Sequence, residues 1–274
     1  GSVTATATEV SYKAQLKTEK SRGSSRGVIN YETGFDIQYD ASLLDLDEVK
    51  KVSVLEVSGT GTATGSTKGN ADSATFTVDF DGKNIGLQKY KLGDTSLNLS
   101  YKAGNLYATK IQGTLVSSRY LGQLTVDLRE DMIQGKVQFP FIDLAVIKDS
   151  IKENLPIPVS LSGSGSAVVD INGPLNPDKL SFKAKARLYN CMVEGQHFDT
   201  ADADISSELG AVTLNSVLLE EKNSNLLFTG GFDLERKSLN IFFKSQRYYL
   251  DDFYLVRFFN TPSKGTFAVD GVIN

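Results

Sequence analysis

The chain is poor in the residues that carry most catalytic and structural chemistry. Its 274 residues include one cysteine, one histidine, two methionines and no tryptophan. The single cysteine, Cys191, excludes an internal disulfide, and its neighbours Met192 and Val193 predict a buried, unreactive side chain. The single histidine, His197, has no second histidine or cysteine near it in sequence, which disfavours metal binding and acid–base catalysis.

Excess positive charge and long apolar runs are also missing. The net charge of −4 and the isoelectric point near 5.2 argue against a nucleic-acid partner, which normally needs a basic face. No run approaches the roughly 18 apolar residues of a membrane-spanning helix. We therefore expect any membrane anchor or signal to lie outside this sequence.

What the chain does contain is a repeat. The segment 58–62 (SGTGT) matches 162–166 (SGSGS), and Asp94-Thr95, Gly104 and Asp127-Leu128 recur at offsets that drift only from 104 to 106 residues. Three similar segments, 44–49, 142–147 and 250–256, precede each new Gly-rich opening. Repeats of this kind determine the architecture. We therefore divide the chain into the end of a preceding repeat (1–54), repeat A (55–158), repeat B (159–262) and the start of a following repeat (263–274), as a piece of a longer array.

Most of the chain alternates apolar and polar residues with period two. Leu180, Phe182 and Ala184 alternate with Ser181 and Lys183, and clusters of Gly, Asn and Asp separate such runs. This pattern predicts an all-β, antiparallel fold of about twenty short strands, each with one apolar and one polar face. Short helices are expected at 142–154 and, as a turn or two, at 43–51 and 250–259.

The apolar face of every strand must be hidden. Tandem β-sandwiches of about 100 residues each are one solution, with a linker near 155–158. The second solution is an elongated, curled antiparallel sheet whose concave side is an apolar groove. The absence of Trp and the many small inward residues, such as Ala186 and Gly230, favour this curled sheet over the sandwiches.

The pattern resembles the AsmA-like/TamB family of the bacterial envelope. The resemblance covers residues 55–260, and 173–177 (GPLNP) before a strand is its most specific phrase. Repeat A departs from it, with 69–72 reading GNAD. The resemblance implies a taco-shaped sheet in the periplasm of a diderm bacterium, in a protein anchored in the inner membrane. It also implies phospholipid transport towards the outer membrane, contacts with neighbouring repeats, and an Omp85-type outer-membrane barrel as a further partner.

The groove hypothesis names inward side chains and no catalytic residue, metal or cofactor. An acyl chain would contact them while its headgroup stays in water. The predicted lining residues are Phe76, Val78, Phe80, Leu97, Leu99, Leu180, Phe182, Ala184, Leu226, Phe228 and Phe232.

Other chemistry has weaker support. Asp199, Asp202 and Asp204 could supply calcium oxygens, but a solvated outer face explains them better. The segment 163–165 is followed by a strand and not by the helix that a nucleophile elbow requires. The segment 59–61 lacks the helix and lysine of a phosphate-binding loop. An enzyme therefore has no residue to support it, and the alternative function is a structural or adhesive envelope module.

Two clusters remain open. Basic residues surround Ser24 and Ser25 and are interpreted as a hairpin loop, with contact to anionic headgroups as the alternative. Aromatic residues between Tyr248 and 259 are interpreted as a core at a repeat junction, with a lipid-facing or interface role as the alternative. The basic residues are Lys13, Lys17, Lys20, Arg22 and Arg26.

Overall fold

The fold was analysed in a computed structural model of the chain. The residues that it describes are 1–49, 56–70, 72–87, 90–151, 160–175, 179–208, 210–233, 236, 238–249, 252 and 265–273.

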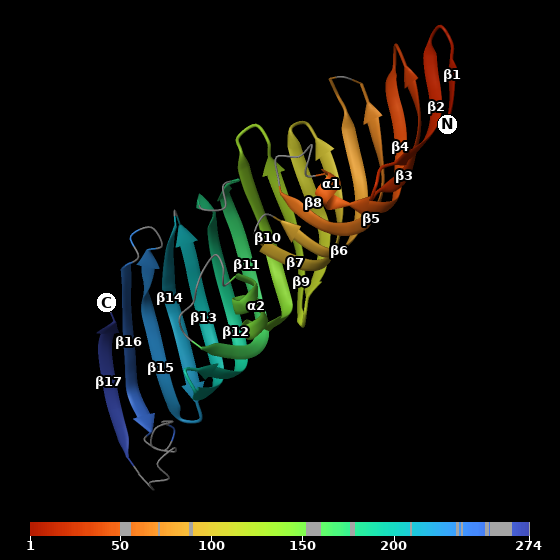
Figure 1. Cartoon of the computed structure of the whole chain (residues 1–274). Helices are drawn as coiled ribbons and strands as arrows, with labels where there is room; N and C mark the ends of the chain where they lie inside the picture. The colour runs from red at the N-terminus through yellow and green to blue at the C-terminus, as the bar shows by residue number, and fades with distance from the viewer. Residues whose placement is uncertain are drawn as a thin grey trace. The chain divides into compact units, whose positions relative to one another are not determined.

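The described residues form one open, antiparallel sheet of 17 strands with two short helices. This confirms the predicted all-β, curled-sheet class, and the described residues do not form the two packed sheets of a sandwich. The chain divides into two compact units, residues 1–116 with 121–132 and residues 117–120 with 133–274. Within each unit the strands lie side by side in chain order (Figure 1).

The first compact unit holds the strands up to β8. They are β1 (Ser2–Ala5), β2 (Glu9–Lys17), β3 (Arg22–Asn30), β4 (Gly34–Asp45), β5 (Val57–Gly69), β6 (Thr75–Leu87), β7 (Tyr90–Lys102) and β8 (Asn105–Leu115), with helix α1 (Leu46–Val49) after β4. Each pairs antiparallel with the next along the chain. Strand β9 (Ser118–Asp127) is shared between the two units.

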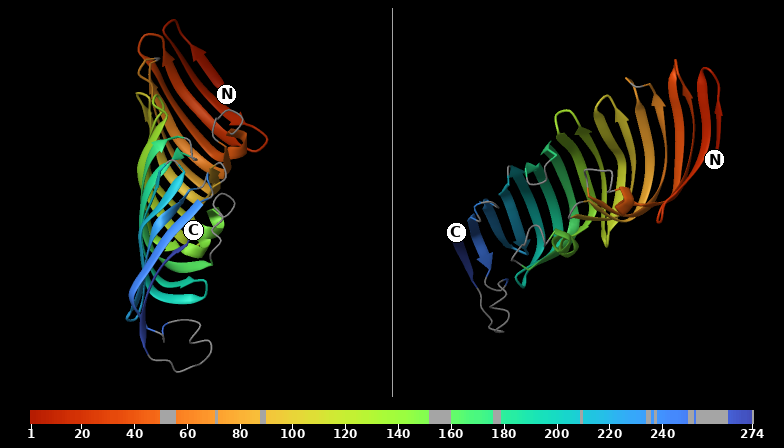
Figure 2. Two further views of the ribbon diagram at one scale, coloured as in Figure 1. Left: turned by 90° about the vertical axis from the view of Figure 1, so that its left-hand side faces the viewer. Right: turned by 45° about the horizontal axis from the view of Figure 1, so that its top comes forward.

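The second compact unit continues from β10 (Met132–Asp143). Its elements are α2 (Leu144–Ile151), β11 (Leu161–Pro174), β12 (Ser181–Val193), β13 (Gln196–Glu208), β14 (Ala211–Glu221), β15 (Ser224–Asp233), β16 (Ser238–Tyr249) and β17 (Thr266–Ile273). The registers from β11 to β17 again join consecutive strands. Its strands are bowed, and α2 lies on the concave side (Figure 2).

The strands are fewer and longer than the sequence predicts. Most contain 9 to 14 residues, because a strand continues through a β-bulge where the alternation breaks. In β6 the register shifts between Gly82 and Ile85, and Asn84 between them has φ of 53°. A period-two reading ends the strand there, whereas the backbone bends and carries on to Leu87.

The repeat is visible in the backbone. Strands β6 to β10 each begin 106 residues before β12 to β16, in the same order. The positive-φ glycines Gly59 and Gly163 sit at matching register shifts, between Ser58 and Thr60 and between Ser162 and Ser164. Gly is the residue that adopts such a conformation without strain. The Gly-rich openings therefore mark bulges at the start of β5 and β11.

The described parts of the expected helices are present. α2 spans Leu144–Ile151, and residues 152–159, including the end of the expected helix and the expected linker, lie outside the described residues. α1 (Leu46–Val49) is the expected turn of helix in 43–51, and most of the expected helix at 250–259 also lies outside the described residues.

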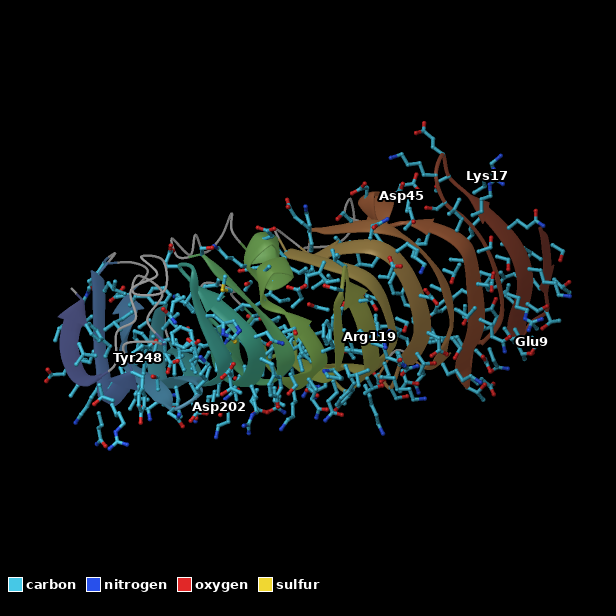
Figure 3. All side chains as sticks on the ribbon, turned by 90° about the horizontal axis from the view of Figure 1, so that it is seen from below. Glu9, Lys17, Asp45, Arg119, Asp202 and Tyr248 are labelled. Atoms are coloured by element: carbon cyan, nitrogen blue, oxygen red, sulfur yellow. The ribbon has the colours of Figure 1, made fainter. Side chains whose placement is uncertain are left out.

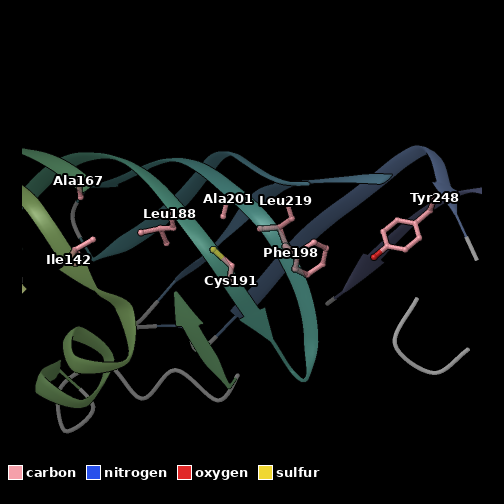
Figure 4. Close-up of a cluster of buried hydrophobic side chains, with 8 residues drawn as sticks. All are labelled: Ile142, Ala167, Leu188, Cys191, Phe198, Ala201, Leu219 and Tyr248. Atoms are coloured by element: carbon pink, nitrogen blue, oxygen red, sulfur yellow. The ribbon is translucent and has the colours of Figure 1, made fainter. Parts of the chain in front are cut away.

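The buried core lies in the second compact unit. Ile142, Leu188, Phe198, Leu219 and Tyr248 are its large members, and Cys191 lies among them at 2% exposure (Figure 4). Leu144 and Ile147 of α2 pack against the same cluster. The helix therefore covers part of the apolar face of the sheet.

Candidate functional site: the apolar face of the sheet

The predicted lining residues of the first compact unit come together on one face. In the β6–β7 register Phe80 lies opposite Leu97, Val78 opposite Leu99, and Phe76 opposite Tyr101. Directly opposite side chains of an antiparallel pair point to the same face. The Phe76 and Tyr101 rings stack with centroids 6.1 Å apart. All of the predicted side chains here are half-buried, so they remain reachable from solvent.

The neighbouring strand, β5, presents almost no side chain to this face. Its residues opposite Phe80, Val78 and Phe76 are Ala63, Gly65 and Thr67. A Cβ placed on Gly65 would lie 2.6 Å from Cε2 of Tyr39 and 2.3 Å from the carbonyl oxygen of Thr77. The Tyr39 ring therefore lies over Gly65, and the Phe80 ring lies close to Gly61 in the same way.

The predicted residues of the second compact unit also share a face. Ala184 lies opposite Val169 and Ile205, and Phe182 opposite Ile171 and Ser207. Leu180 precedes β12 and is half-buried.

On β15 three predicted residues face the same way. Leu226 lies opposite Leu219, Phe228 opposite Val217 and Phe243, and Phe232 opposite Val212 and Leu239. The Phe228 and Phe243 rings are 6.2 Å apart.

Sequence reasoning missed several residues of this face. Ile205, Leu214, Val217, Ile241 and Phe243 all lie in its rows. β16 was overlooked because three apolar residues in succession, 241–243, hide the period-two signal. In β14 a register shift between Leu214 and Val217 breaks the alternation. Bulges and runs that are apolar on both faces are therefore where pattern reading fails.

The opposite face is polar and neutralises its own charges. Arg187 Nε lies 3.6 Å from Asp202, and Lys185 Nζ lies 3.4 Å from Asp204. Asp202 points away from the side on which α2 lies (Figure 3). The pKa of Asp204 is lowered, first by the hydrogen bond from the Asn215 side-chain amide and then by Lys185. Both carboxylates lie on an outer face, as predicted, and each already has a cationic partner.

A shallow depression of about 520 Å³ lies on this polar face of the second unit. Its rim includes the two ion pairs just described, and Leu218 and Leu227 contribute its apolar floor. Four charged groups that pair with one another offer little to a ligand. The apolar face, with its rows of half-exposed side chains, is the stronger candidate site.

A serine, half-buried at Ser21 and buried at Ser118 and Ser224, recurs beside each junction between repeats. The hydroxyls of Ser21, Ser118 and Ser224 accept the backbone N–H groups of Asp45, Asp143 and Tyr249 at 3.0, 2.9 and 2.8 Å. Ser224 also donates to Asp252, which is 4% exposed and lies 3.4 Å from Nζ of Lys222. These contacts hold the junctions in place, and no chemistry follows from them.

The structure describes the surroundings of both Cys191 and His197. Burial raises the pKa of the Cys191 thiol, which keeps it protonated and unreactive. Nδ1 of His197 lies 3.9 Å from the buried carboxylate of Glu221 and 4.0 Å from Asp199. Among the described residues, no group of three or more His, Cys, Asp or Glu side chains is arranged to hold a metal ion.

The two open clusters are only partly resolved. Lys13, Lys17, Arg22 and Arg26 lie in the paired strands β2 and β3, so the loop interpretation is wrong for them. Tyr248 is buried in the core, whereas 253–259 lie outside the described residues.

No protein-family model, curated protein or solved structure matches the chain. The resemblance to the AsmA-like/TamB family therefore remains a hypothesis. In the described part of the chain, neither helix has the length and apolar character needed to cross a membrane.

Proposed function

We propose that this chain is a segment of an AsmA-like/TamB-type envelope protein that shields lipid acyl chains on its apolar face. The observation that carries the proposal is the set of half-exposed apolar rows on one face of a sheet whose other face carries most of its charged side chains. Soluble proteins rarely leave contiguous apolar surface open unless something binds it. The periplasm, transport of phospholipid between two membranes and an Omp85-type partner belong to the same proposal and rest on the family resemblance.

The shape of the apolar face suits an acyl chain. Around β5 the rings of Tyr39 and Phe80 lie over glycines, so the surface is smooth and has few protruding side chains. Burying one methylene is worth about 0.8 kcal/mol, so a chain would be held firmly by many small contacts. None of those contacts is directional, and the chain could therefore slide along the face.

The experiment is native mass spectrometry and lipid extraction of the purified chain, with variants on neighbouring positions of one strand. Val78→Asp places a charge on the apolar face, and Thr77→Asp places the same charge on the polar face of β6. We expect Val78→Asp to lose bound lipid while Thr77→Asp keeps it. Circular dichroism checks that both variants fold.

A second set of three variants tests the other compact unit. Phe182→Asp and Phe228→Asp should lose lipid, whereas Thr229→Asp on the opposite face should not. Absence of bound lipid in the parent chain, or lipid retained in all inward variants, would overturn the proposal and favour a structural module.

A further inference from the structure

The polar face of the β2–β3 hairpin opposes like charges. In the register of these strands Lys13 lies opposite Arg26 and Lys17 opposite Arg22, with the neutral pair Gln15 and Ser24 between them. All four cations are exposed. Like charges directly across an antiparallel pair are destabilising. We name residues 9–30 the basic hairpin.

The protein does not neutralise these cations itself. The Arg26 guanidinium donates to Oε1 of Gln38 at 3.0 and 2.8 Å, which orients its charge without cancelling it. Within the described ranges, no ion pair joins Lys13, Lys17 or Arg22 to a carboxylate. The acids on this face are Glu9, at the other end of β2, and two residues of β4, Asp36 and Asp40, of which Asp36 pairs with Lys68. The four cations therefore outnumber the carboxylates left to them.

Elsewhere the sheet treats its outward charges differently. Lys68 lies 3.0 Å from Asp36, Lys83 lies 2.8 Å from Asp94, and the β12–β13 pairs were described above. In the registers of β3 to β8 and of β11 to β17 no other two cations lie directly opposite each other, and in this respect the basic hairpin differs from those strands.

The end of the hairpin is held in place, and an exposed leucine of β4 lies beside its cations. The hydroxyls of Thr18 and Ser21 both donate to Glu48, and Lys20 lies 3.6 Å from Asp45. Leu43, opposite Arg22 and on the same face, is 42% exposed. Cations beside exposed aliphatic side chains are typical of segments that lie at a lipid surface.

We propose that the basic hairpin docks on the surface of an anionic phospholipid bilayer. Lys13, Lys17, Arg22 and Arg26 would meet the phosphates, and Leu43, which lies opposite Arg22 on the same face, would enter the headgroup region. A nucleic acid fits less well, because the chain is acidic overall and the outward face of β2 and β3 carries no aromatic side chain for stacking. This surface lies on the opposite side of the sheet from the acyl-binding face and does not depend on it.

The test is flotation of the full chain with phosphatidylcholine vesicles prepared with and without phosphatidylglycerol. We expect binding only when phosphatidylglycerol is present, and weaker binding as salt rises. Each charge removed should weaken binding about fivefold. The variants are Lys17→Gln with Arg22→Gln, all four cations to Gln, and Leu43→Ser.

The matched control is Lys183→Gln with Lys185→Gln, two outward lysines of the second compact unit opposite Asp170 and Asp204. This control should bind vesicles like the parent chain. Equal binding to neutral vesicles, unchanged binding of the fourfold variant, or capture by an oligonucleotide in preference to vesicles would each overturn the proposal. The fourfold variant should still retain acyl lipid in native mass spectrometry, so failure of this proposal is distinguishable from failure of the acyl-binding proposal.

Discussion

The two repeats differ in the size of the side chains along one equivalent row of the sheet. In repeat A, Gly61, Gly82, Thr95 and Gly113 lie side by side across β5 to β8. In repeat B the corresponding row across β11 to β14 is Gly165, Leu188, Ala201 and Leu219. Repeat B therefore fills this row with its own leucines, whereas repeat A leaves it nearly bare.

Repeat A covers its bare row from the side. A Cβ on Gly82 would lie 2.5 Å from Cδ1 of Ile85 and 2.6 Å from Cε1 of Phe80, so these two side chains lie over it. The difference shows that the repeat keeps bulge positions and strand order while the lining side chains change. Repeat B supplies most of the buried cluster that packs against α2, whereas the buried apolar side chains of β6 and β8 in repeat A are Ile85 and Ile111.

The largest effect is expected from emptying the filled row. Leu219→Ala removes a side chain that is 5% exposed and packed in the core, so we expect the free energy of unfolding to fall by about 3 kcal/mol. Chemical denaturation measures it. Leu99→Ala, on the half-buried lining of repeat A, is the control and should cost about 1 kcal/mol. Equal losses would contradict the distinction between core and lining.

Filling the nearly bare row of repeat A is expected to lower the free energy of unfolding somewhat less than Leu219→Ala does. Gly82→Leu would force Ile85 and Phe80 out of place, and overpacking of this kind costs about 1–3 kcal/mol. Thermal unfolding measures it, with Gly86→Leu as the comparison, because the nearest atom to a Cβ there is the movable Ser58 hydroxyl. A Gly82→Leu protein as stable as the parent would show that the row is not covered from the side.

Replacing the junction serines Ser224 and Ser118 should lower the free energy of unfolding by different, smaller amounts. Ser224→Ala removes the acceptor for the Tyr249 N–H and one donor to the buried Asp252, so we expect a loss of about 2 kcal/mol. Ser118→Ala removes one acceptor, for the Asp143 N–H, and should cost about 1 kcal/mol. Both values come from urea unfolding curves. A larger loss at Ser118 would mean that Asp252 contributes little.

The smallest effect concerns pH. The hydrogen bonds from Lys83 and from the Asn84 backbone N–H lower the pKa of Asp94 below its ordinary value of 3.8. A lowered carboxyl pKa stabilises the fold above the unfolded-state value, and this stabilisation is lost as the pH falls through the lower folded-state value. Asp94→Asn should therefore flatten the acid side of the pH–stability curve slightly. A steeper loss of stability with falling pH in Asp94→Asn than in the parent chain would contradict the lowered pKa of Asp94.

The sequence was sufficient for the fold class because alternation and turn residues are local signals. It also placed Phe76, Val78, Phe80, Leu97 and Leu99 on strands whose register brings them together. It could not show that Tyr39 and Phe80 lie over glycines, or that leucines replace Gly82 and Gly113 in repeat B, because these features depend on the pairing of particular strands. The opposition of Lys13 to Arg26 is likewise a property of register.

The central claim is that acyl chains contact the apolar face and not the polar face. Because the chain has no tryptophan, a single one can report on each face. Leu99→Trp and Ser100→Trp are neighbours on β7 that point to opposite faces. With brominated phospholipid, we predict strong quenching of the Trp fluorescence of Leu99→Trp and little for Ser100→Trp. Equal quenching of the two, or none in either, would contradict the account.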